Sequence, residues 1–407
     1  MDTQIHPDAL SLPAAARSTA SSGRSLSVYV LVDALGWRVA DAYGFLRSAL
    51  PVRAPLRTTL GYSSGAIPTI LTGVPPSVHG HWNLLYYDPQ GSPFRRLRHL
   101  PPALLQRLDG RYGRFALGWI GRHLLGLGPS FECAVRPADL PWFNWAEKRH
   151  LYQPGSLAPY PSAFDNWERA RLPYAIYSYR SGDDWRLLQR ARLAIASGKT
   201  RVIFLYLCGL DHSLHCHRDN PAALRADLTR YATALESLYA AACAGDPRCR
   251  FRVFSDHGMA PVSRRVPLRA ALQQRGWQLQ RDYLAVFDST MLRLWFLNQQ
   301  ARHDIEAWLR TLDCGRVLDE AELRRQGVWF PDGRFGEVIF LLDAGCMVRE
   351  GEFNGRGWNP SGMHGYDPAD PDSDAVLLSN VPADARLTRI DDLYTCLCEP
   401  LQEEQTA

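Results

Sequence analysis

Three short runs of apolar residues stand out along the chain, at 26–35, 201–207 and 250–255. The first has no polar interruption from Val28 to Val32, which is typical of a strand covered on both faces in a parallel sheet, and we interpret the other two in the same way. Between the second and third runs, residues 222–242 carry apolar side chains at three- and four-residue spacing and predict an amphipathic helix. A strand, a helix and a strand in this order form a βαβ unit, so we expect an α/β fold with a largely parallel mixed sheet between layers of helices.

Two stretches interrupt this α/β pattern. Residues 96–195 are rich first in arginine and then in aromatic residues and proline, and we interpret them as a cap-like insertion over the sheet. Residues 266–350 contain short strand-like runs and one helical stretch near 303–311, which predicts a smaller α+β insertion. The core domain would then be assembled from three separate parts of the chain, namely 25–95, 196–265 and 351–400.

The composition is that of an ordinary soluble globular protein, with 46% hydrophobic and 22% charged residues. A net charge of +4 over 407 residues gives no support to a protein that coats a nucleic-acid polymer. Because no run of about 18 apolar residues occurs, we expect no membrane span. Residues 1–24 lack the pattern of a signal peptide and are expected to form a mobile tail. The nine cysteines are scattered without a CxxC pair, which favours a reducing compartment and a cytoplasmic location.

Ionisable side chains follow each of the three predicted strands. Asp33 ends the first, Asp211 comes four residues after the second, and Asp256 with His257 ends the third. The carboxyl ends of parallel strands meet at one edge of a sheet, where ligands bind in open α/β folds. Three carboxylates gathered there would repel one another unless a cation held them. The alternative is that each aspartate only caps the helix that follows its strand.

Histidines accompany these aspartates at informative spacings. Asp211 and His215 are four residues apart, so on a helix they share a face and can hold one metal ion. His364 lies in the segment GMHGYDP, between glycines that let the backbone pass close to a site. His212 and His217 are off the four-residue spacing, and we expect them on the surface or behind the metal ligands.

A pair of serines precedes another short apolar stretch. Ser63 and Ser64 come directly before the segment GAIPTIL, which places a hydroxyl at or just before the N-terminus of a helix. The free amide groups and the dipole of a helix N-terminus favour an oxyanion there. The simpler interpretation is a serine that only caps the helix.

Taken in order, the segments VLVDALG, SSGAIPTILTGVPPSVHG, GLDHSLH, FSDHGM and GMHGYDP resemble the motifs of the alkaline phosphatase superfamily, and most closely its nucleotide pyrophosphatase/phosphodiesterase branch. The resemblance runs from about residue 26 to 380. It implies an alkaline phosphatase-like fold with two divalent metal ions at the carboxyl edge of the sheet, with zinc as the expected metal and manganese as the alternative. It assigns one ion to Asp211, His215 and His364, and the other to Asp33, Asp256 and His257.

The same resemblance implies a nucleophile. Counting back from Thr72-Gly73 by the family interval gives Ser63 and leaves Ser64 as the alternative. The family's phosphate-contacting asparagine corresponds to Asn83, one residue closer to its HG dipeptide than usual. The nucleophile of the phosphodiesterase branch is usually threonine, whereas serine is more like the monoesterases.

Substrate contacts are less specified by the sequence. Ser64-Gly65 replaces the Phe-Pro that commonly follows the nucleophile, so the leaving-group pocket is expected to differ in shape. We expect Ser64 and Trp82 to contact the substrate. The insertion also carries residues that could bind a second phosphate or stack on a base, or that could simply form a solvated face and a local core: Arg95, Arg96, Arg98, Arg107, Arg111, Arg114, Trp119, Trp142 and Trp145.

The resemblance therefore implies a metal-dependent phosphohydrolase that cleaves a phosphodiester or pyrophosphate bond of a small nucleotide-like substrate through a phosphoseryl intermediate. A phosphomonoesterase on the same scaffold is the main alternative, followed by a phosphoryl transferase or mutase. A sulfatase is disfavoured because Ser63 is not followed by Pro-x-Arg. A non-catalytic binding protein is disfavoured because all six ligand candidates and a nucleophile are present. The expected partners are a small phosphoester and a second copy of the chain in a homodimer, with neither a membrane nor a nucleic-acid polymer.

Overall fold

The centre of the protein is a six-stranded mixed sheet. This computed structural model describes residues 25–128, 131–353, 358–382 and 386–406, so the tail expected at 1–24 lies outside the described residues. The sheet has the order β2-β16-β7-β1-β6-β5. The central strand β1 is parallel to both of its neighbours, and β16 is antiparallel to β7 and β2. The strands are β1 (Ser27–Val32), β2 (Val52–Leu56), β5 (Tyr174–Tyr177), β6 (Val202–Leu207), β7 (Arg250–Phe254) and β16 (Ala375–Ser379).

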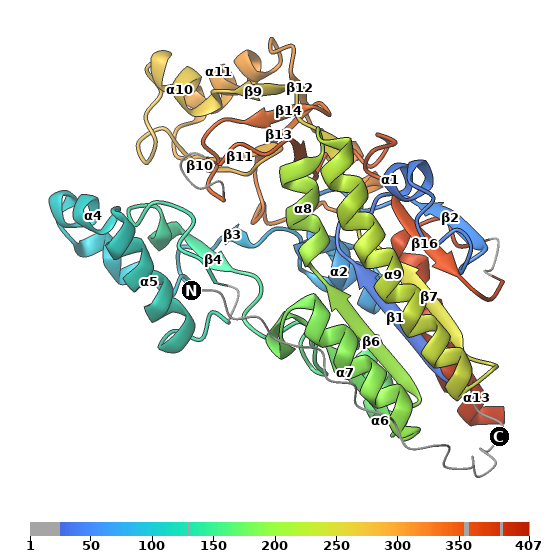
Figure 1. Ribbon diagram of the computed structural model, residues 1–407. Helices are drawn as coiled ribbons and strands as arrows, with labels where there is room; N and C mark the ends of the chain where they lie inside the picture. Colours follow the sequence, from blue (N-terminus) through green and yellow to red (C-terminus); the bar gives the residue numbers. More distant parts are fainter. Residues whose placement is uncertain (1–24, 129–130, 354–357, 383–385, 407) are drawn as a thin grey trace, which may run out of the picture.

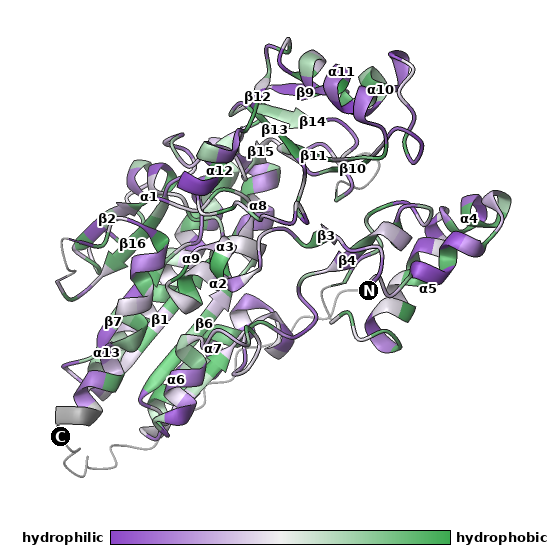
Figure 2. Ribbon diagram, turned by 180° about the vertical axis from the view of Figure 1, so that it is seen from behind, coloured by the Kyte–Doolittle hydropathy of each residue, from purple (hydrophilic) through white to green (hydrophobic). Residues whose placement is uncertain are grey.

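Helices cover both faces of this sheet (Figure 1). Val28, Val30 and Val32 point to one face, where they pack in a core with α1, α7, α8 and α9. Tyr29 and Leu31 point to the other face, where α2, α6 and α13 complete a second core. Because both faces are covered, β1 and β6 are predominantly hydrophobic, as Figure 2 shows. Strand β7 differs, since it carries Arg250 and Arg252. The helices are α1 (Trp37–Ala42), α2 (Ser63–Thr72), α6 (Ala163–Arg169), α7 (Asp184–Ser197), α8 (Gly209–His217), α9 (Pro221–Gly245) and α13 (Leu393–Thr406).

The predicted α+β insertion forms a second, antiparallel sheet with the order β10-β11-β13-β12. One of its faces packs against α10 and α11. The short strands β9 (Arg264–Val266) and β14 (Cys346–Val348) pair beside it, and β8 (Ala260–Pro261) pairs with β15 (Gly362–Met363). The remaining elements are β10 (Tyr283–Phe287), β11 (Met291–Phe296), β12 (Gly315–Val317), β13 (Val338–Leu342), α10 (Leu268–Gln274), α11 (Gln299–Leu309) and α12 (Glu320–Arg325).

The predicted cap is smaller than expected and leans on this second sheet. Leu284, Val286 and Trp295 of the insertion share a core with cap residues such as Phe143 and Trp145. The cap contains β3 (Leu85–Tyr87), α4 (Pro102–Leu108), α5 (Arg111–His123) and β4 (Phe143–Trp145), with two short 3₁₀ turns at Arg95–His99 and Leu140–Trp142. The short helix α3 (Pro76–His79) belongs to the core, where it follows α2 and packs against it.

The boundary predicted for the cap at 96–195 is wrong in its second half. Strand β5 pairs in parallel with β6 and is the edge strand of the main sheet. Helices α6 and α7 likewise pack on the two faces of that sheet rather than on the cap. The aromatic and proline residues near 142–165 hid this return to the core, because they interrupt the periodicity by which strands and helices are predicted.

The three strands and the long helix expected in the core are confirmed as β1, β6, β7 and α9. Strands β10, β11 and β13 and helix α11 likewise confirm the elements expected in the α+β insertion. Within the described residues, no helix has both the length and the apolar character needed to cross a membrane.

Candidate active site

The structure brings the three strand ends together. Asp33 directly follows β1, Asp211 lies in the first turn of α8 after β6, and Asp256 and His257 follow β7. Since β1 is hydrogen-bonded in parallel to both β6 and β7, their carboxyl ends share one edge of the sheet. Open α/β folds bind their ligands at this position, outside the carboxyl ends of the strands.

Asp33, Asp256 and His257 form one compact group, which we call group A. Their ligand atoms lie within 4.8 Å of one another, and all three residues are buried. His257 Nε2 is 3.2 Å from Asp256 Oδ2 and 3.6 Å from Asp33 Oδ1. The other ring nitrogen, Nδ1, donates to the Gly258 carbonyl at 3.0 Å, which leaves the lone pair of Nε2 directed at the two carboxylates.

Asp211, His215 and His364 form a second compact group, group B, and its ligand atoms also lie within 4.8 Å of one another. Asp211 Oδ1 is 3.3 Å from His215 Nε2 and 3.6 Å from His364 Nε2. His215 Nδ1 donates to the Gly362 carbonyl at 2.7 Å, so its Nε2 is again the free acceptor. The helix α8 places Asp211 and His215 on one face, as their four-residue spacing predicts.

The two groups are adjacent. The rings of His257 and His364 are stacked with centroids 3.9 Å apart, which joins group A to group B. Burial raises the pKa of Asp33 well above its usual range, and the neighbouring Asp256 and Asp211 carboxylates raise it further. Burial also tends to raise the pKa of Asp211, but the adjacent imidazole groups of His215 and His364 outweigh it, so the net shift is downward. Burial and the nearby His257 lower the pKa of His364.

Both groups fit divalent metal ions. Within the described part of the chain, Asp256 Oδ2 and Asp211 Oδ1 are buried without a hydrogen-bond donor, as is His364 Nδ1. Leaving such polar atoms unpaired in a low dielectric costs several kcal/mol in total unless a ligand satisfies them. Each group offers three oxygen and nitrogen donors, and His215 and His257 are oriented by backbone carbonyls, which is typical of histidines that bind metal. Carboxylate and imidazole donors suit zinc and manganese.

Ser63 is the hydroxyl that faces this site. It is the first residue of α2, and its Oγ lies 2.9 Å from His257 Nε2 and 3.5 Å from Asp33 Oδ1. The adjacent Ser64 points elsewhere, because its Oγ donates to the Trp82 carbonyl at 2.8 Å. The structure therefore resolves the choice between the two serines in favour of Ser63 as the one beside group A.

A cavity of about 380 Å³ opens beside Ser63 and group B and is lined by Ser63, Ser64, Asn83, His215 and His364, among others. Asn83 is almost fully buried at its wall, and its Oδ1 has no hydrogen-bond partner among the described residues. Its Nδ2 donates to Met291 Sδ at 3.6 Å, which is a weak acceptor, so the amide group must turn over before it can offer an N–H to a ligand on the side of Oδ1.

The expected substrate contact of Trp82 is not supported. Its side chain is fully buried, packs against Phe330 and Phe335 and donates its indole N–H to the Leu60 carbonyl at 2.6 Å. It belongs to the core between α2 and the α+β insertion and does not line the cavity described above. The sequence could not show this, because its packing partners come from residues about 250 positions away.

Two features of the site escaped the sequence. Tyr206, at the end of β6, donates its hydroxyl to Asp33 Oδ2 and so orients a ligand carboxylate. The turn between β10 and β11 brings Asp288 and Ser289 to the cavity, and Thr290 holds Tyr62, whose hydroxyl is 2.9 Å from Thr290 Oγ1. The sequence pattern predicts only a buried strand residue at position 206, and no motif indicates that the turn between β10 and β11 belongs to the site.

Comparison with known proteins agrees with this geometry. The family model of the type I phosphodiesterases and nucleotide pyrophosphatases matches residues 62–367, which include Ser63, both histidines of group B and the DHG segment. The chain belongs to this family. Its members are phosphoester hydrolases of the alkaline phosphatase superfamily, so the expected superfamily is confirmed. No match is found among curated protein sequences.

Solved structures show the same fold. Murine ectonucleotide pyrophosphatase/phosphodiesterase 5 superposes with a TM-score of 0.63 at 15% identity, covering 93% of this chain and 95% of that one. An inactive form of the murine protein in complex with AMP gives 0.61 at 16% identity over the same shares. Phosphonoacetate hydrolase from Sinorhizobium meliloti 1021, in complex with phosphonoformate, gives 0.60 at 14% identity, covering 92% of this chain and 95% of that one. At such identities, this phosphodiesterase-family protein shares the architecture of these enzymes, and its substrate must be argued from its own residues.

Proposed function

We propose that this protein is a two-metal phosphohydrolase that cleaves a phosphodiester or pyrophosphate bond of a small, nucleotide-like substrate, with Ser63 as the nucleophile. One observation supports the proposal above all others. The Ser63 hydroxyl contacts His257 of group A. Group B, the second cluster of ligand residues, lies next to group A through the stacked rings of His257 and His364. A phosphoryl group placed between the two groups would meet the hydroxyl on one side and leave room for its leaving group on the other.

In the proposed mechanism, Asp33, Asp256 and His257 hold one divalent cation and Asp211, His215 and His364 hold the other, with zinc as the expected metal. When bound, the two ions would neutralise the charge on the phosphoryl oxygens and lower the pKa of the Ser63 hydroxyl. Ser63 Oγ gives its proton to bulk water and attacks phosphorus, so that a serine–phosphorus ester forms as the bond to the leaving oxygen breaks. The leaving oxygen takes up a proton from bulk water. Another water then attacks phosphorus, the serine–phosphorus ester breaks, and Ser63 regains its proton as the phosphate product leaves.

The surrounding residues position these groups. Helix α2 begins at Ser63, and the backbone amide groups at its N-terminus favour negative charge on the transferred phosphoryl group. Asn83 would donate a hydrogen bond to a phosphoryl oxygen, and Tyr206 fixes the orientation of Asp33. The AMP bound by the murine relative supports a nucleotide-like substrate for this chain as well.

The test compares two adjacent serines. Ser63→Ala should abolish hydrolysis of bis(4-nitrophenyl) phosphate while the metal content per chain stays at the wild-type value. Ser64→Ala is the matched control, since its hydroxyl only bonds a backbone carbonyl, and it should keep most of the activity. Full activity in Ser63→Ala would refute the assigned nucleophile.

The ligand sets need a separate measurement. Asp256→Ala removes a fully buried ligand of group A and should lose one metal ion per chain by elemental analysis. The exposed Asp313→Ala is a control for the loss of a carboxylate far from either group. Two ions retained in Asp256→Ala would contradict the assignment of group A.

A phosphomonoesterase remains the second candidate because the nucleophile is serine where the phosphodiesterase branch usually has threonine. The ratio of kcat/KM for bis(4-nitrophenyl) phosphate to that for 4-nitrophenyl phosphate separates the two, and we expect it to favour the diester. The cytoplasmic location and the homodimer stay predictions, to be tested by cell fractionation and by light scattering.

A further inference from the structure

The outer edge of the cap exposes a large share of the protein's apolar surface. Six of the eleven large hydrophobic side chains that are exposed in the described part of the chain lie between residues 104 and 125. Helices α4 and α5 carry most of them, and Figure 1 shows these two helices projecting from the rest of the molecule. A single exposed apolar residue needs no explanation, but a cluster of this size typically marks an interaction surface.

Tyr112, Phe115 and Trp119 form the exposed side of α5, which we call the cap face. Their spacings of three and four residues place them on one side of the helix, and they are 85%, 68% and 47% exposed. The opposite side of α5 is buried, since Leu117 packs in the core that the cap shares with the insertion. Helix α5 is therefore covered on one side and uncovered on an apolar side.

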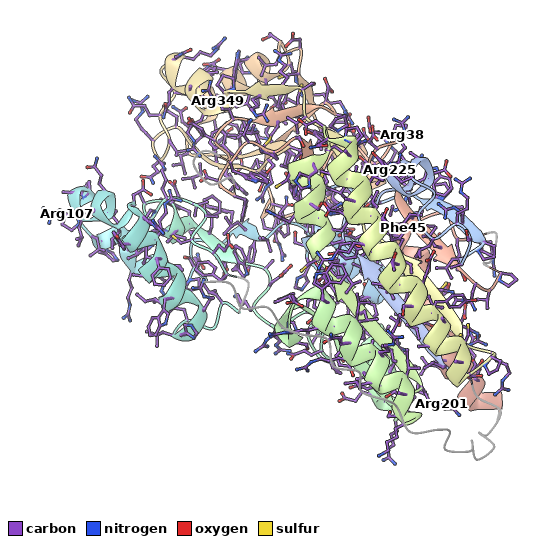
Figure 3. All side chains as sticks on the ribbon, in the orientation of Figure 1. Arg38, Phe45, Arg107, Arg201, Arg225 and Arg349 are labelled. Carbon is purple, nitrogen blue, oxygen red and sulfur yellow. The ribbon has the colours of Figure 1, made fainter. Side chains whose placement is uncertain are left out.

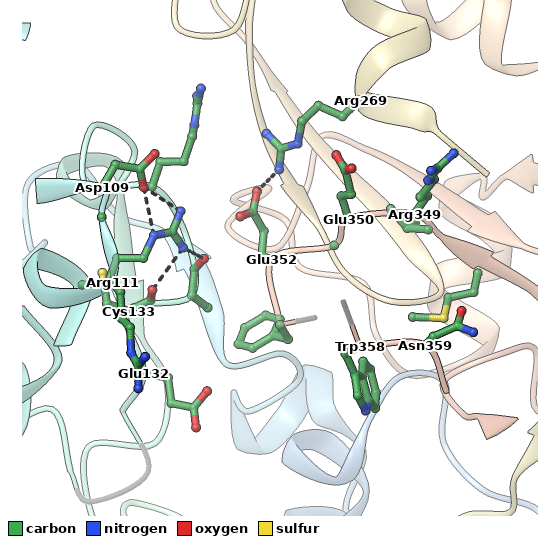
Figure 4. Close-up of a pocket in the computed structure, with 18 of the residues that line it drawn as sticks. Asp109, Arg111, Glu132, Cys133, Arg269, Arg349, Glu350, Glu352, Trp358 and Asn359 are labelled. Carbon is green, nitrogen blue, oxygen red and sulfur yellow. Dashed lines mark hydrogen bonds and ion pairs between the residues drawn. The ribbon is translucent and has the colours of Figure 1, made fainter. Parts of the chain in front are cut away.

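The cap face does not turn toward the insertion. A cavity of about 1490 Å³ lies between the cap and the insertion, and its described lining includes Asp109 and Arg111 but none of the three aromatic residues of the cap face. Figure 4 shows Asp109 and Arg111 on the cap side of this cavity, and Arg269 and Arg349 on the facing side. The start of α5 thus borders the cavity, while its aromatic residues are presented to solvent.

Positive charge is concentrated in the same part of the chain. Residues 95–125 contain seven arginines and a single aspartate, whereas the whole chain of 407 residues carries a net charge of only +4. Arg107 is exposed and shares a side of α4 with the exposed Leu104, three residues before it. Arg111 is exposed as well and precedes Phe115 by one helical turn, so it lies at the edge of the cap face. This surface combines apolar side chains with an excess of arginine.

Such a combination suits an anionic lipid surface better than a second copy of the chain. A two-fold symmetric contact through the cap face would bring the same arginines of both copies together, and like charges repel. Anionic headgroups attract arginine, while aromatic side chains insert at the boundary between the headgroups and the acyl chains. The expectation of no membrane partner rested on the absence of a long apolar run, but a helix that lies in the plane of the interface needs none.

We propose that the cap face is a docking site for the surface of a membrane that contains anionic phospholipids. Helix α5 lies in the plane of the interface with Tyr112, Phe115 and Trp119 among the headgroups, and Arg107 and Arg111 contact the anionic groups of the lipids. The protein binds this surface peripherally and reversibly. Since none of these five residues belongs to the described lining of the catalytic cavity, docking leaves that cavity open.

Sedimentation of the full chain with lipid vesicles tests the docking. Vesicles of equimolar phosphatidylcholine and phosphatidylglycerol should bind the wild type, and added salt should weaken the binding because it screens the arginines. Vesicles of phosphatidylcholine alone should bind the protein more weakly. Tyr112→Ala/Phe115→Ala/Trp119→Ala should lower the partition coefficient on the mixed vesicles by about tenfold or more. Arg107→Ala/Arg111→Ala should lower it by about fivefold for each arginine lost.

Two control variants separate the cap face from non-specific binding. Leu193→Ala/Leu297→Ala removes two exposed apolar side chains outside the cap. Arg38→Ala/Arg225→Ala removes two exposed arginines, which Figure 3 shows on the opposite side of the molecule from Arg107. Both controls should bind the mixed vesicles as the wild type does. Because every substituted side chain is exposed, each variant should keep the circular dichroism spectrum and the urea transition of the wild type.

A second readout locates Trp119 relative to the lipid. Phospholipids that are brominated near the headgroup quench the fluorescence of a tryptophan that contacts them. They should quench the bound wild type, whereas Trp119→Phe should still bind and lose most of the quenching. Equal quenching of the two proteins at the same bound fraction would show that the cap face does not insert.

The outcomes are distinct. A wild type that does not bind the mixed vesicles, or a triple alanine variant that binds them unchanged, overturns the proposal. Equal weakening by Arg38→Ala/Arg225→Ala also overturns it, because the attraction would then be general electrostatics. If the wild type binds no vesicles and the triple variant turns a dimer into a monomer in light scattering, the cap face is instead a contact between copies of the chain. None of these measurements depends on turnover, so a failure of the proposed hydrolase activity would leave them unaffected.

Discussion

The buried ion pair between Arg293 and Asp288 connects the α+β insertion to the catalytic cavity, and its loss has a calculable cost. Arg293 Nε lies 2.6 Å from Asp288 Oδ2, and the side chains are 0% and 3% exposed. Arg293 Nη1 also donates to the Leu85 carbonyl at 2.8 Å and to the Phe335 carbonyl at 3.4 Å. Arg293 thereby joins β3 of the cap to the insertion, while Asp288 lines the cavity above Ser63.

Replacing Arg293 by methionine keeps most of the side-chain volume and removes the charge. The Asp288 carboxylate is then buried without its cation, which typically costs about 3–5 kcal/mol. The carbonyl groups of Leu85 and Phe335 also lose the hydrogen bonds that Arg293 donates. The cost given above already includes these lost hydrogen bonds. We therefore expect Arg293→Met to lower the free energy of unfolding by about 3–5 kcal/mol.

The penalty should depend on pH in a defined direction. Burial already raises the pKa of Asp288 in the intact protein, and removing Arg293 takes away the charge that lowers it. In the variant, Asp288 gains a proton in the folded state at higher pH than an unfolded aspartate does, so folding becomes less favourable as the pH rises. The cost of Arg293→Met should be smaller at about pH 5 than at about pH 8.

Urea denaturation of the wild type and the variant at both pH values measures this cost, with fluorescence and circular dichroism required to give the same transition. Asp288→Leu/Arg293→Met removes both charges and should recover at least about 2 kcal/mol of the single-variant loss. Arg302→Met is the control, because its pair with Glu337 is exposed and is worth about 1 kcal/mol or less. A cost below about 1 kcal/mol for Arg293→Met, or the same cost at both pH values, would refute the reasoning.

Three further outcomes are expected. Tyr206→Phe removes the hydrogen bond to Asp33 and should weaken binding of one metal ion by about 10- to 100-fold in a competition with a zinc-sensitive dye; unchanged affinity of both ions would contradict the role of Tyr206. Removing the metal ions with a chelator should lower the melting temperature, because an ion present at about 1,000 times its Kd stabilises the fold by about 4 kcal/mol. An unchanged melting temperature would argue against bound ions. Because burial raises the pKa of Glu352 from 4.5 to about 7, the folded state holds this proton longer than the unfolded state, and stability falls as the pH rises through that window. Glu352→Gln should flatten this fall in urea titrations, and an identical slope would show that Glu352 does not cause it.

The sequence alone determined the three central strands of the sheet and the convergence of three aspartates at their ends, while the division of the ligands into two groups came from the family resemblance. The apolar runs of β1, β6 and β7 predict buried parallel strands, and parallel neighbours must place Asp33, Asp211 and Asp256 at one edge. The spacing of Asp211 and His215 is likewise a local property of a helix. Such predictions succeed because they depend on backbone geometry within one element or between adjacent strands.

The tertiary structure decided everything that depends on contacts between distant segments. The family interval gives Ser63 and leaves Ser64 as the alternative, and only the packing of α2 shows that the Ser63 hydroxyl lies beside His257 while the Ser64 hydroxyl donates to the Trp82 carbonyl. Trp82 could have lined the site or the core, and the insertion that covers it settled the matter.

The cavity between the cap and the α+β insertion, which is lined by Arg111 and Arg349, shows the same limit on a larger scale. Arg111 and Arg349 are more than 200 positions apart, and each belongs to an addition whose placement over the sheet no periodicity encodes. The sequence supplied the charges, but a cleft exists only because the cap and the α+β insertion share a core around Trp145 and Trp295. Hydrophobic packing between the two additions therefore decides where these arginines lie, and no local pattern of the sequence encodes that packing.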